Sequence, residues 1–402
     1  MPSLQHSSRV SFNGRPSYGP RYRLKVIRKI APRPDALEWA DVPAPECGPD
    51  EVLLRVRAAS LCGTDAHIFN WDDSIAGKIL AATDGLRRPL ILGHEFCGEV
   101  VEVGRDVGGV GEAEAESIRP GDLVSAESHI VCGRCYQCRH GEYHVCMRET
   151  IIGVQRDGGF AEFIAIPARC AWIQDASTVP VDIACVAEPF GNAVHAATEY
   201  DPRDRCVVIF GVGPIGLFST IVAAARGAER IITVDTSPFR LGLASRVGAD
   251  RTIETHPAPS SDPEARARER ERLNGMIRDE AQPFEVDLVM EMSGHPDALD
   301  TSLRVVRRGG KVVLFGLPRQ KAVTLERYSE DVIFGGVTLK GIIGRKLYGT
   351  WKTSRELMAE ASVRDKIRTV ITHTVPFSRY QEAFQMMLGR ESGKVVMSIA
   401  EA

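Results

Sequence analysis

Short apolar runs separated by Gly/Pro turns dominate the first part of the chain. Residues 51–59 follow the turn at 47–50 and have the pattern of a strand, in which Val and Leu alternate with charged residues. A second strand is predicted at 98–104, and the turn at 119–122 precedes another apolar pair, Leu123 and Val124. Many short strands with such turns predict an irregular β domain.

The pattern changes near residue 200, where buried strands alternate with apolar helices. Strands are predicted at 206–210, 231–235, 286–291 and 311–316, and helices at 215–225 and 240–247. This alternation predicts an α/β domain with a parallel, doubly wound sheet. The charged stretch 264–272 predicts an exposed helix without chemistry, and a last strand is predicted at 393–398.

Composition bounds the number of domains and disfavours some classes of partner, but it does not indicate a function. The chain has 402 residues, 44% hydrophobic and 26% charged, with a net charge of -3. These values are typical of a globular protein of two or three domains. They favour neither a nucleic acid nor a membrane as the main partner, and no apolar run is long enough for a membrane helix.

The N-terminus differs from the rest of the chain. Residues 1–34 contain no Asp or Glu and are rich in Arg and Ser. We interpret 1–22 as a disordered extension, with an organelle transit peptide as the alternative. No apolar segment follows the basic residues, which argues against a secretory signal.

A glycine loop lies between the first predicted strand and helix of the α/β domain. Gly211, Gly213 and Gly216 fit G-x-G-x-x-G, and Asp235 follows nineteen residues after the last glycine. This context predicts a dinucleotide site, with the phosphates at the helix N-terminus. A carboxylate at Asp235 favours NAD over NADP. The alternative is a glycine turn that binds nothing.

Four cysteines lie in one short segment, at Cys132, Cys135, Cys138 and Cys146. Four thiolates make a closed tetrahedral site, so the spacing predicts a structural zinc. A nucleic-acid-binding zinc module and free or disulfide-bonded thiols are the alternatives. We interpret the cysteine usage as typical of a reducing compartment, and therefore expect a cytoplasmic protein.

A second, mixed set of metal-binding residues occurs earlier in the chain. Cys62 and His94 can hold a zinc, with Glu95 or water completing the set. Three protein ligands and one exchangeable position define a catalytic zinc.

Several motifs together resemble the zinc-dependent medium-chain alcohol dehydrogenases. They are Cys62-Gly-Thr-Asp-Ala-His-Ile-Phe-Asn-Trp-Asp72, Gly93-His-Glu-Phe-Cys-Gly-Glu-Val100, the four-cysteine segment and Glu188-Pro-Phe-Gly-Asn-Ala-Val-His195. The first and last of these, with residues 129–132, 340–345 and 350–351, are similar to the L-threonine 3-dehydrogenase branch. The resemblance runs from about residue 24 to the C-terminus.

The resemblance implies a fold and a set of roles. The implied fold is a GroES-like irregular β-barrel catalytic domain at 23–195 and 346–402, with a Rossmann domain at 196–345. Cys62, His94 and Glu95 would be catalytic zinc ligands, Glu188 the carboxylate behind the metal, and Thr64 with His67 a proton relay. His129 would lie on the substrate side. The implied NAD contacts, beyond the glycines, are Ile215, Asp235, Arg240, Phe315, Gly316, Leu317, Ile342 and Ile343.

The implied activity is hydride transfer from a secondary alcohol to NAD, with one catalytic and one structural zinc per chain. For this branch the expected reaction is L-threonine to 2-amino-3-oxobutanoate, catalysed by a homotetramer. A polyol or other secondary-alcohol dehydrogenase is the alternative, because the stretch 73–88 is longer than usual and follows the His67 motif. A non-catalytic NAD-binding relative is a third reading.

Overall fold

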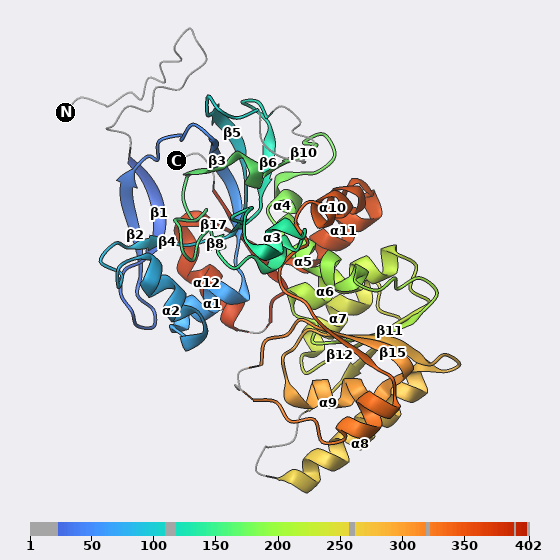
Figure 1. Cartoon of the computed structure of the whole chain (residues 1–402). Helices are drawn as coiled ribbons and strands as arrows, with labels where there is room; N and C mark the ends of the chain where they lie inside the picture. Colours follow the sequence, from blue (N-terminus) through green and yellow to red (C-terminus); the bar gives the residue numbers. More distant parts are fainter. Residues whose placement is uncertain (1–22, 109–117, 257–261, 319–321, 390, 400–402) are drawn as a thin grey trace, which may run out of the picture. The chain divides into compact units, whose positions relative to one another are not determined.

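The computed structural model describes residues 23–108, 118–256, 262–318, 322–389 and 391–399 (Figure 1). The extension at 1–22 lies outside these residues. The chain divides into two compact units. The first comprises the described residues of Met1–Ile130, Glu149–Ser177 and Ser398–Ala402, and the second those of Val131–Arg148 and Thr178–Met397. Within the described residues, no helix is long and apolar enough to span a bilayer. The predicted domain bounds stay a prediction.

The first unit is built on antiparallel strands, as the sequence pattern predicts. Its main sheet places β10 (Ala171–Gln174), β6 (Leu123–Ala126), β5 (Glu95–Val103) and β3 (Glu51–Ser60) side by side, with β9 (Phe163–Pro167) also paired to β3. A second sheet has the order β2 (Leu37–Pro43), β1 (Arg23–Lys29), β4 (Leu90–Ile91). β7 (His129–Ile130) pairs with β8 (Thr150–Ile151).

Two helices of this unit follow β3. α1 (Gly63–Asn70) begins directly after Cys62, and α2 (Asp73–Ala82) occupies most of the long stretch 73–88. Ala76 and Ile79 are the buried residues of α2, whose remaining positions are exposed or partly exposed. The additional residues after the His67 motif therefore form an ordered helix.

The second unit contains a six-stranded parallel sheet. Its order is β13 (Arg251–Glu254), β12 (Arg230–Asp235), β11 (Cys206–Phe210), β14 (Val286–Glu291), β15 (Val306–Leu314) and β16 (Thr338–Gly341). Numbered along the chain this is 3-2-1-4-5-6, the order of a doubly wound dinucleotide-binding sheet. The connecting helices are α6 (Pro214–Ala225), α7 (Pro238–Val247), α8 (Pro263–Ala281) and α9 (Pro296–Val305). The predicted doubly wound fold is confirmed.

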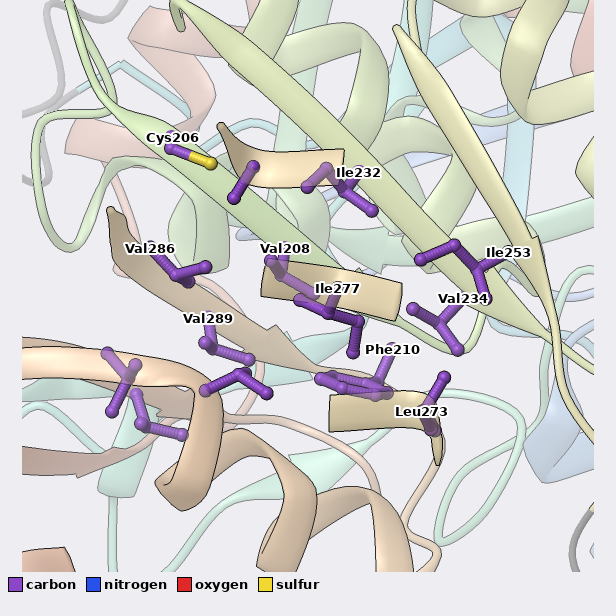
Figure 2. Packing of buried hydrophobic residues seen from close by; sticks show 14 of the residues in the cluster. Cys206, Val208, Phe210, Ile232, Val234, Ile253, Leu273, Ile277, Val286 and Val289 are labelled. Atoms are coloured by element: carbon purple, nitrogen blue, oxygen red, sulfur yellow. The ribbon is translucent and has the colours of Figure 1, made fainter. Parts of the chain in front are cut away.

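One face of this sheet packs against α8 and α9. Figure 2 shows Val208, Phe210 and Val234 of the strands meeting Leu273 and Ile277 of α8. The exposed helix predicted at 264–272 is thus the first part of a 19-residue helix, whose C-terminal half is buried against the strands.

The remaining elements of the second unit lie outside the parallel sheet. The cysteine segment contains α3 (Tyr136–Arg139) and a short 3₁₀ turn at Tyr143–Val145. The others are α4 (Val181–Ala184), α5 (Ala187–Thr198), α10 (Gly349–Ala359), α11 (Ala361–Val370), β17 (Ile371–Pro376), α12 (Tyr380–Leu388) and β18 (Lys394–Ser398).

Candidate zinc and dinucleotide sites

Strand register brings the mixed metal-ligand set together. Ser60, the last residue of β3, pairs with Glu95, the first residue of β5. Cys62 lies two residues beyond the end of β3, and His94 lies one residue before β5. Their ligand atoms and a carboxylate oxygen of Glu95 all lie within 4.8 Å of one another. The predicted Cys62, His94 and Glu95 set is therefore assembled in the first unit.

Buried polar side chains surround this set. Asp65 is fully buried; it accepts a hydrogen bond from the Cys62 N–H at 2.9 Å and lies 3.9 Å from His94 Nδ1. The Ser60 hydroxyl donates to Glu95 Oε2. Gly93 precedes His94 with φ of +92°, and a Cβ there would be 2.2 Å from the Phe160 ring. Glycine is thus required where the chain turns into the site.

The donor chemistry of the set suits zinc. A thiolate, an imidazole and a carboxylate are the three ligand types that zinc takes in proteins, and three protein ligands leave one position for a substrate or water. His94 and Glu95 are 6% and 0% exposed, so these two ligand side chains are shielded from solvent. The arrangement has the form of a catalytic rather than a structural zinc centre.

The residues of the expected proton relay lie on α1. The Thr64 hydroxyl is 3.9 Å from Cys62 Sγ. His67, one turn along the helix, is exposed, and its Nδ1 lies 2.5 Å from Asp72 Oδ2. His129 is half-buried in the same unit, where its backbone N–H donates to Glu127 Oε1 at 2.7 Å and its Nδ1 lies 3.2 Å from the same oxygen.

Glu188 belongs to the first turn of α5, in the second unit. Its Oε1 accepts a hydrogen bond from Arg345 Nη1 at 2.6 Å, and the same nitrogen donates to Asn192 Oδ1 at 2.9 Å. Asn192 Nδ2 lies 3.4 Å from Glu188 Oε2. The buried carboxylate and guanidinium and the partly exposed amide of Asn192 thus form one hydrogen-bonded group.

The four sulfurs of Cys132, Cys135, Cys138 and Cys146 also lie within 4.8 Å of one another. None of the ten cysteines, all within the described residues, is in a disulfide. Backbone N–H groups point at the sulfurs: those of Cys132 and Arg148 donate to Cys146, and that of Cys135 donates to Cys132, each at 3.4 Å. Such donors stabilise thiolates, the form that binds zinc.

The thiol pKa values in this cluster are split. The Cys138 N–H, as the main cause, lowers the pKa of Cys135 to about 6, whereas burial raises the pKa of Cys138 to about 12. Four thiols this close cannot all ionise without a cation among them. The cluster fits a closed four-sulfur zinc site.

The glycine loop has the geometry of a dinucleotide cradle. Gly216 sits so close to the loop that a Cβ there would be 2.0 Å from the Gly211 carbonyl oxygen. A Cβ at Gly213, the N-cap of α6, would meet nothing within 4 Å, so this position leaves room for a phosphate. Asp235, at the end of β12, accepts from the Val212 N–H at 2.7 Å and from the Ser237 N–H at 2.9 Å.

The other expected NAD contacts occupy the carboxyl ends of the strands and the following helix starts. Gly316 lies against the backbone of Gly294, and Gly211 lies against Ser293, so the loops after β11, β14 and β15 meet. Arg240 is anchored through Nε to the Ser392 carbonyl at 3.3 Å. Ile342 is buried, Ile215, Arg240, Phe315 and Gly316 are partly exposed, and Leu317 and Ile343 are exposed.

Sequence reasoning missed three charged residues that hold this machinery. Arg345, Asp72 and Asp65 all lie inside motifs that carry the family resemblance, but the sequence alone assigns none of them a role. The only sequence signal for Asp65 is its place three residues after Cys62, where a first-turn carboxylate reaches back to the residue before the helix.

Comparison with known proteins agrees with this geometry. Residues 48–175 match the alcohol dehydrogenase GroES-like domain, and residues 214–360 match the zinc-binding dehydrogenase domain. L-threonine 3-dehydrogenase of Symbiobacterium thermophilum is 39% identical, over 93% of this chain and 97% of its own length. L-threonine 3-dehydrogenase of Pyrococcus horikoshii is 38% identical, over 94% of this chain and 99% of its own.

A solved structure extends the comparison to three dimensions. A zinc-binding dehydrogenase of Sinorhizobium meliloti bound to NADP has a TM-score of 0.77 and 27% identity, over 94% of this chain and 100% of its own. The GroES-like and Rossmann architecture expected from the sequence is confirmed by the two matched domains. Since relatives at 38% identity or more match nearly its whole length, this chain belongs to the zinc-dependent medium-chain alcohol dehydrogenases.

Proposed function

We propose that the protein oxidises the secondary hydroxyl of L-threonine to 2-amino-3-oxobutanoate with NAD. The observation that carries this proposal is full-length similarity, at 38–39% identity, to relatives named L-threonine 3-dehydrogenase. The Cys62, His94 and Glu95 cluster supports it, because its donor set suits a catalytic metal.

Zinc at this cluster would supply a Lewis acid that lowers the pKa of the substrate hydroxyl, and NAD would accept the hydride. The chain's own residues move the proton. Thr64 takes it from the hydroxyl and passes it to His67, whose side chain is 46% exposed and can release it to solvent. Asp65 and Ser60 keep His94 and Glu95 in place meanwhile.

NAD is proposed over NADP because of Asp235. Its carboxylate stands at the end of β12, tied to the glycine loop through Val212. A carboxylate there accepts bonds from the ribose hydroxyls and repels a 2′-phosphate. The Sinorhizobium meliloti structure holds NADP, and a comparison of kcat/KM with NAD and with NADP tests the preference of this chain.

The remaining roles belong to the same proposal. The four cysteines hold a structural zinc, Glu188 acts as the carboxylate near the reacting centre, and His129 contacts substrate. Ile215, Arg240, Phe315–Leu317 and Ile342–Ile343 contact NAD. The catalytic domain is 23–195 with 346–402, and the cofactor domain is 196–345. We also propose a cytoplasmic homotetramer, which light scattering would test as a mass about four times 44.0 kDa.

The test is an activity panel with the zinc-loaded enzyme, following NADH formation at 340 nm. The substrates are L-threonine, L-allo-threonine, L-serine, 2,3-butanediol, sorbitol and myo-inositol. The proposal expects L-threonine to give the highest kcat/KM. The margin over the diol and the polyols should be roughly tenfold or more, since these lack the amino and carboxyl groups and a binding group left unpaired costs at least about 1.4 kcal/mol. A polyol as the best substrate would refute threonine and leave α2 as the first element to alter.

A further inference from the structure

The end of α1 is closed by a motif that joins His67 directly to Asp72. The Asp72 N–H donates to the His67 carbonyl at 2.9 Å, and the Trp71 N–H donates to the Ile68 carbonyl at 3.3 Å. These are the two bonds of a Schellman motif, with Trp71 in its left-handed position at φ 60° and ψ 50°. The motif folds the chain back so that residue 72 lies beside residue 67.

Asp72 uses this position in an unusual way. It is the N-cap of α2, where an aspartate side chain ordinarily accepts a bond from the helix's own N–H groups. Within the described residues Asp72 makes no such capping bond; its Oδ2 lies 2.5 Å from His67 Nδ1 instead. The carboxylate is therefore directed at the imidazole and not at the helix that it begins.

A buried lysine holds the turn in this form. Glycine is the usual residue at the left-handed position, so Trp71 requires support from its surroundings. Lys29 Nζ lies 5.3 Å from the centre of the Trp71 ring, and it donates to the carbonyls of Arg33 at 2.8 Å and Phe69 at 3.4 Å. Lys29 is 0% exposed, so β1 fixes both the last turn of α1 and the tryptophan.

We propose that Asp72 is the positioning residue for His67, fixing which ring nitrogen takes the proton. An ionised carboxylate only accepts hydrogen bonds, so the hydrogen of neutral His67 resides on Nδ1. Nε2 is then the basic atom, and it is the nitrogen that would take the proton arriving through Thr64. This inference rests on the proposed proton relay. It adds Asp72 as the residue that positions His67, and Trp71 and Lys29 as the residues that hold the turn.

The test compares Asp72→Asn with Asp73→Asn in the zinc-loaded enzyme. Asn is as good an N-cap as Asp, so the first variant is expected to fold, which its melting temperature checks. Asp73 is exposed and one residue away, so the second variant removes the same charge without touching His67. A carboxamide offers either an oxygen or an NH₂ to Nδ1 and no longer fixes the tautomer.

Two readouts apply to each variant. The first is acylation of His67 by diethyl pyrocarbonate, mapped by mass spectrometry and normalised to His256, an exposed histidine in the second unit. The second is kcat with the best substrate of the panel, together with the KM for NAD. Asp72→Asn is expected to slow His67 acylation several-fold and to lower kcat roughly 10- to 100-fold at unchanged KM. Asp73→Asn is expected to change neither.

The outcomes separate the two proposals. Wild-type acylation and kcat in Asp72→Asn would overturn the role of Asp72. His67→Gln tests the relay itself, and full activity in that variant would refute the relay. The rate of His67 acylation in Asp72→Asn would still show whether Asp72 positions His67. If Asp72→Asn is too unstable, Asp72→Ser replaces it. Serine also caps helices, but its neutral hydroxyl gives His67 Nδ1 no carboxylate.

Discussion

Arg345 donates to Glu188 across 2.6 Å in a region of the second unit where neither side chain reaches solvent: they are 0% and 3% exposed. Gly191, on the same face of α5, makes the approach possible, because a Cβ there would be 2.7 Å from Arg345 Cδ. The expected catalytic carboxylate is therefore held by a charge partner 157 positions away in sequence.

Removing the arginine from this pair leaves a buried carboxylate without its cation. We expect Arg345→Met to lower the free energy of unfolding by about 3–5 kcal/mol, the usual effect of breaking a buried ion pair. Urea denaturation measures it. The exposed pair of Arg368 and Asp182 is the matched control, and Arg368→Met is expected to change stability by about 1 kcal/mol or less. Similar losses in both variants would argue against a special role for the buried pair.

Asp235 is expected to control cofactor choice. Asp235→Ser removes the charge that opposes a 2′-phosphate, so the ratio of kcat/KM for NAD over NADP should fall roughly 10- to 100-fold, or about 1.4–2.7 kcal/mol. The assay is NADH or NADPH formation at 340 nm. Asp250→Asn is the control, because Asp250 bonds the Ile231 N–H at the opposite end of β12. An unchanged ratio in Asp235→Ser would contradict the predicted preference.

The four-cysteine cluster predicts a second metal per chain. Cys135→Ser should reduce the zinc content, measured by plasma emission, from about two to about one per chain. It should also lower stability by roughly 3 kcal/mol or more, the effect of a ligand present at a hundred times its dissociation constant. Cys47→Ser changes a thiol in the first unit and should retain both metals. Full zinc content in Cys135→Ser would refute the structural site.

His195 makes stability depend on pH. Its Nδ1 donates to the Gly344 carbonyl at 2.8 Å, and burial, as the main cause, lowers its pKa from 6.5 to about 4. Between these values the unfolded chain binds a proton that the folded protein does not, so stability falls as the pH drops from 6.5 toward 4. The full loss in the free energy of unfolding from this one histidine is about 3 kcal/mol.

A glutamine at this position tests the assignment. Its amide can still donate to the Gly344 carbonyl but cannot titrate, so His195→Gln should have a shallower loss of stability between pH 6.5 and pH 5 than the parent. Urea denaturation at several pH values, with zinc present, measures both slopes. Parallel slopes would mean that other groups dominate acid unfolding.

The sequence was sufficient wherever the chemistry is local in the chain. Gly211 and Gly216 specify a turn whose geometry only glycine permits, Gly213 leaves open space beside it, and the cysteine spacing places four sulfurs within one loop. Local sequence alone does not predict the Cys62, His94 and Glu95 set, because Cys62 and His94 are 32 positions apart. Only the register of Ser60 with Glu95 joins them, and the family resemblance supplied that link in advance.

The supporting residues were beyond sequence reasoning for a physical reason. Arg345, Asp72 and Lys29 belong to residue types that are usually solvated. Arg345 and Lys29 gain a role only through partners far away in sequence, and Asp72 gains one only because the turn after α1 folds it back onto His67. The helix α8 shows the same limit: its first half is charged, and the apolar positions Leu273, Ile277 and Ala281 that bury it begin where the predicted helix ended.

The cysteine segment also bears on how the protein is made. Val131–Arg148 belongs to the second unit, although the chain on both sides of it belongs to the first. Val131, Cys138 and Cys146 pack with Leu347, which leaves the ribosome some two hundred residues later. For that interval, a zinc ion bound by the four cysteines would be the cross-link that keeps the segment folded. Capture of zinc by the nascent chain would then precede completion of the cofactor domain, and zinc shortage would act on biosynthesis before it acts on catalysis.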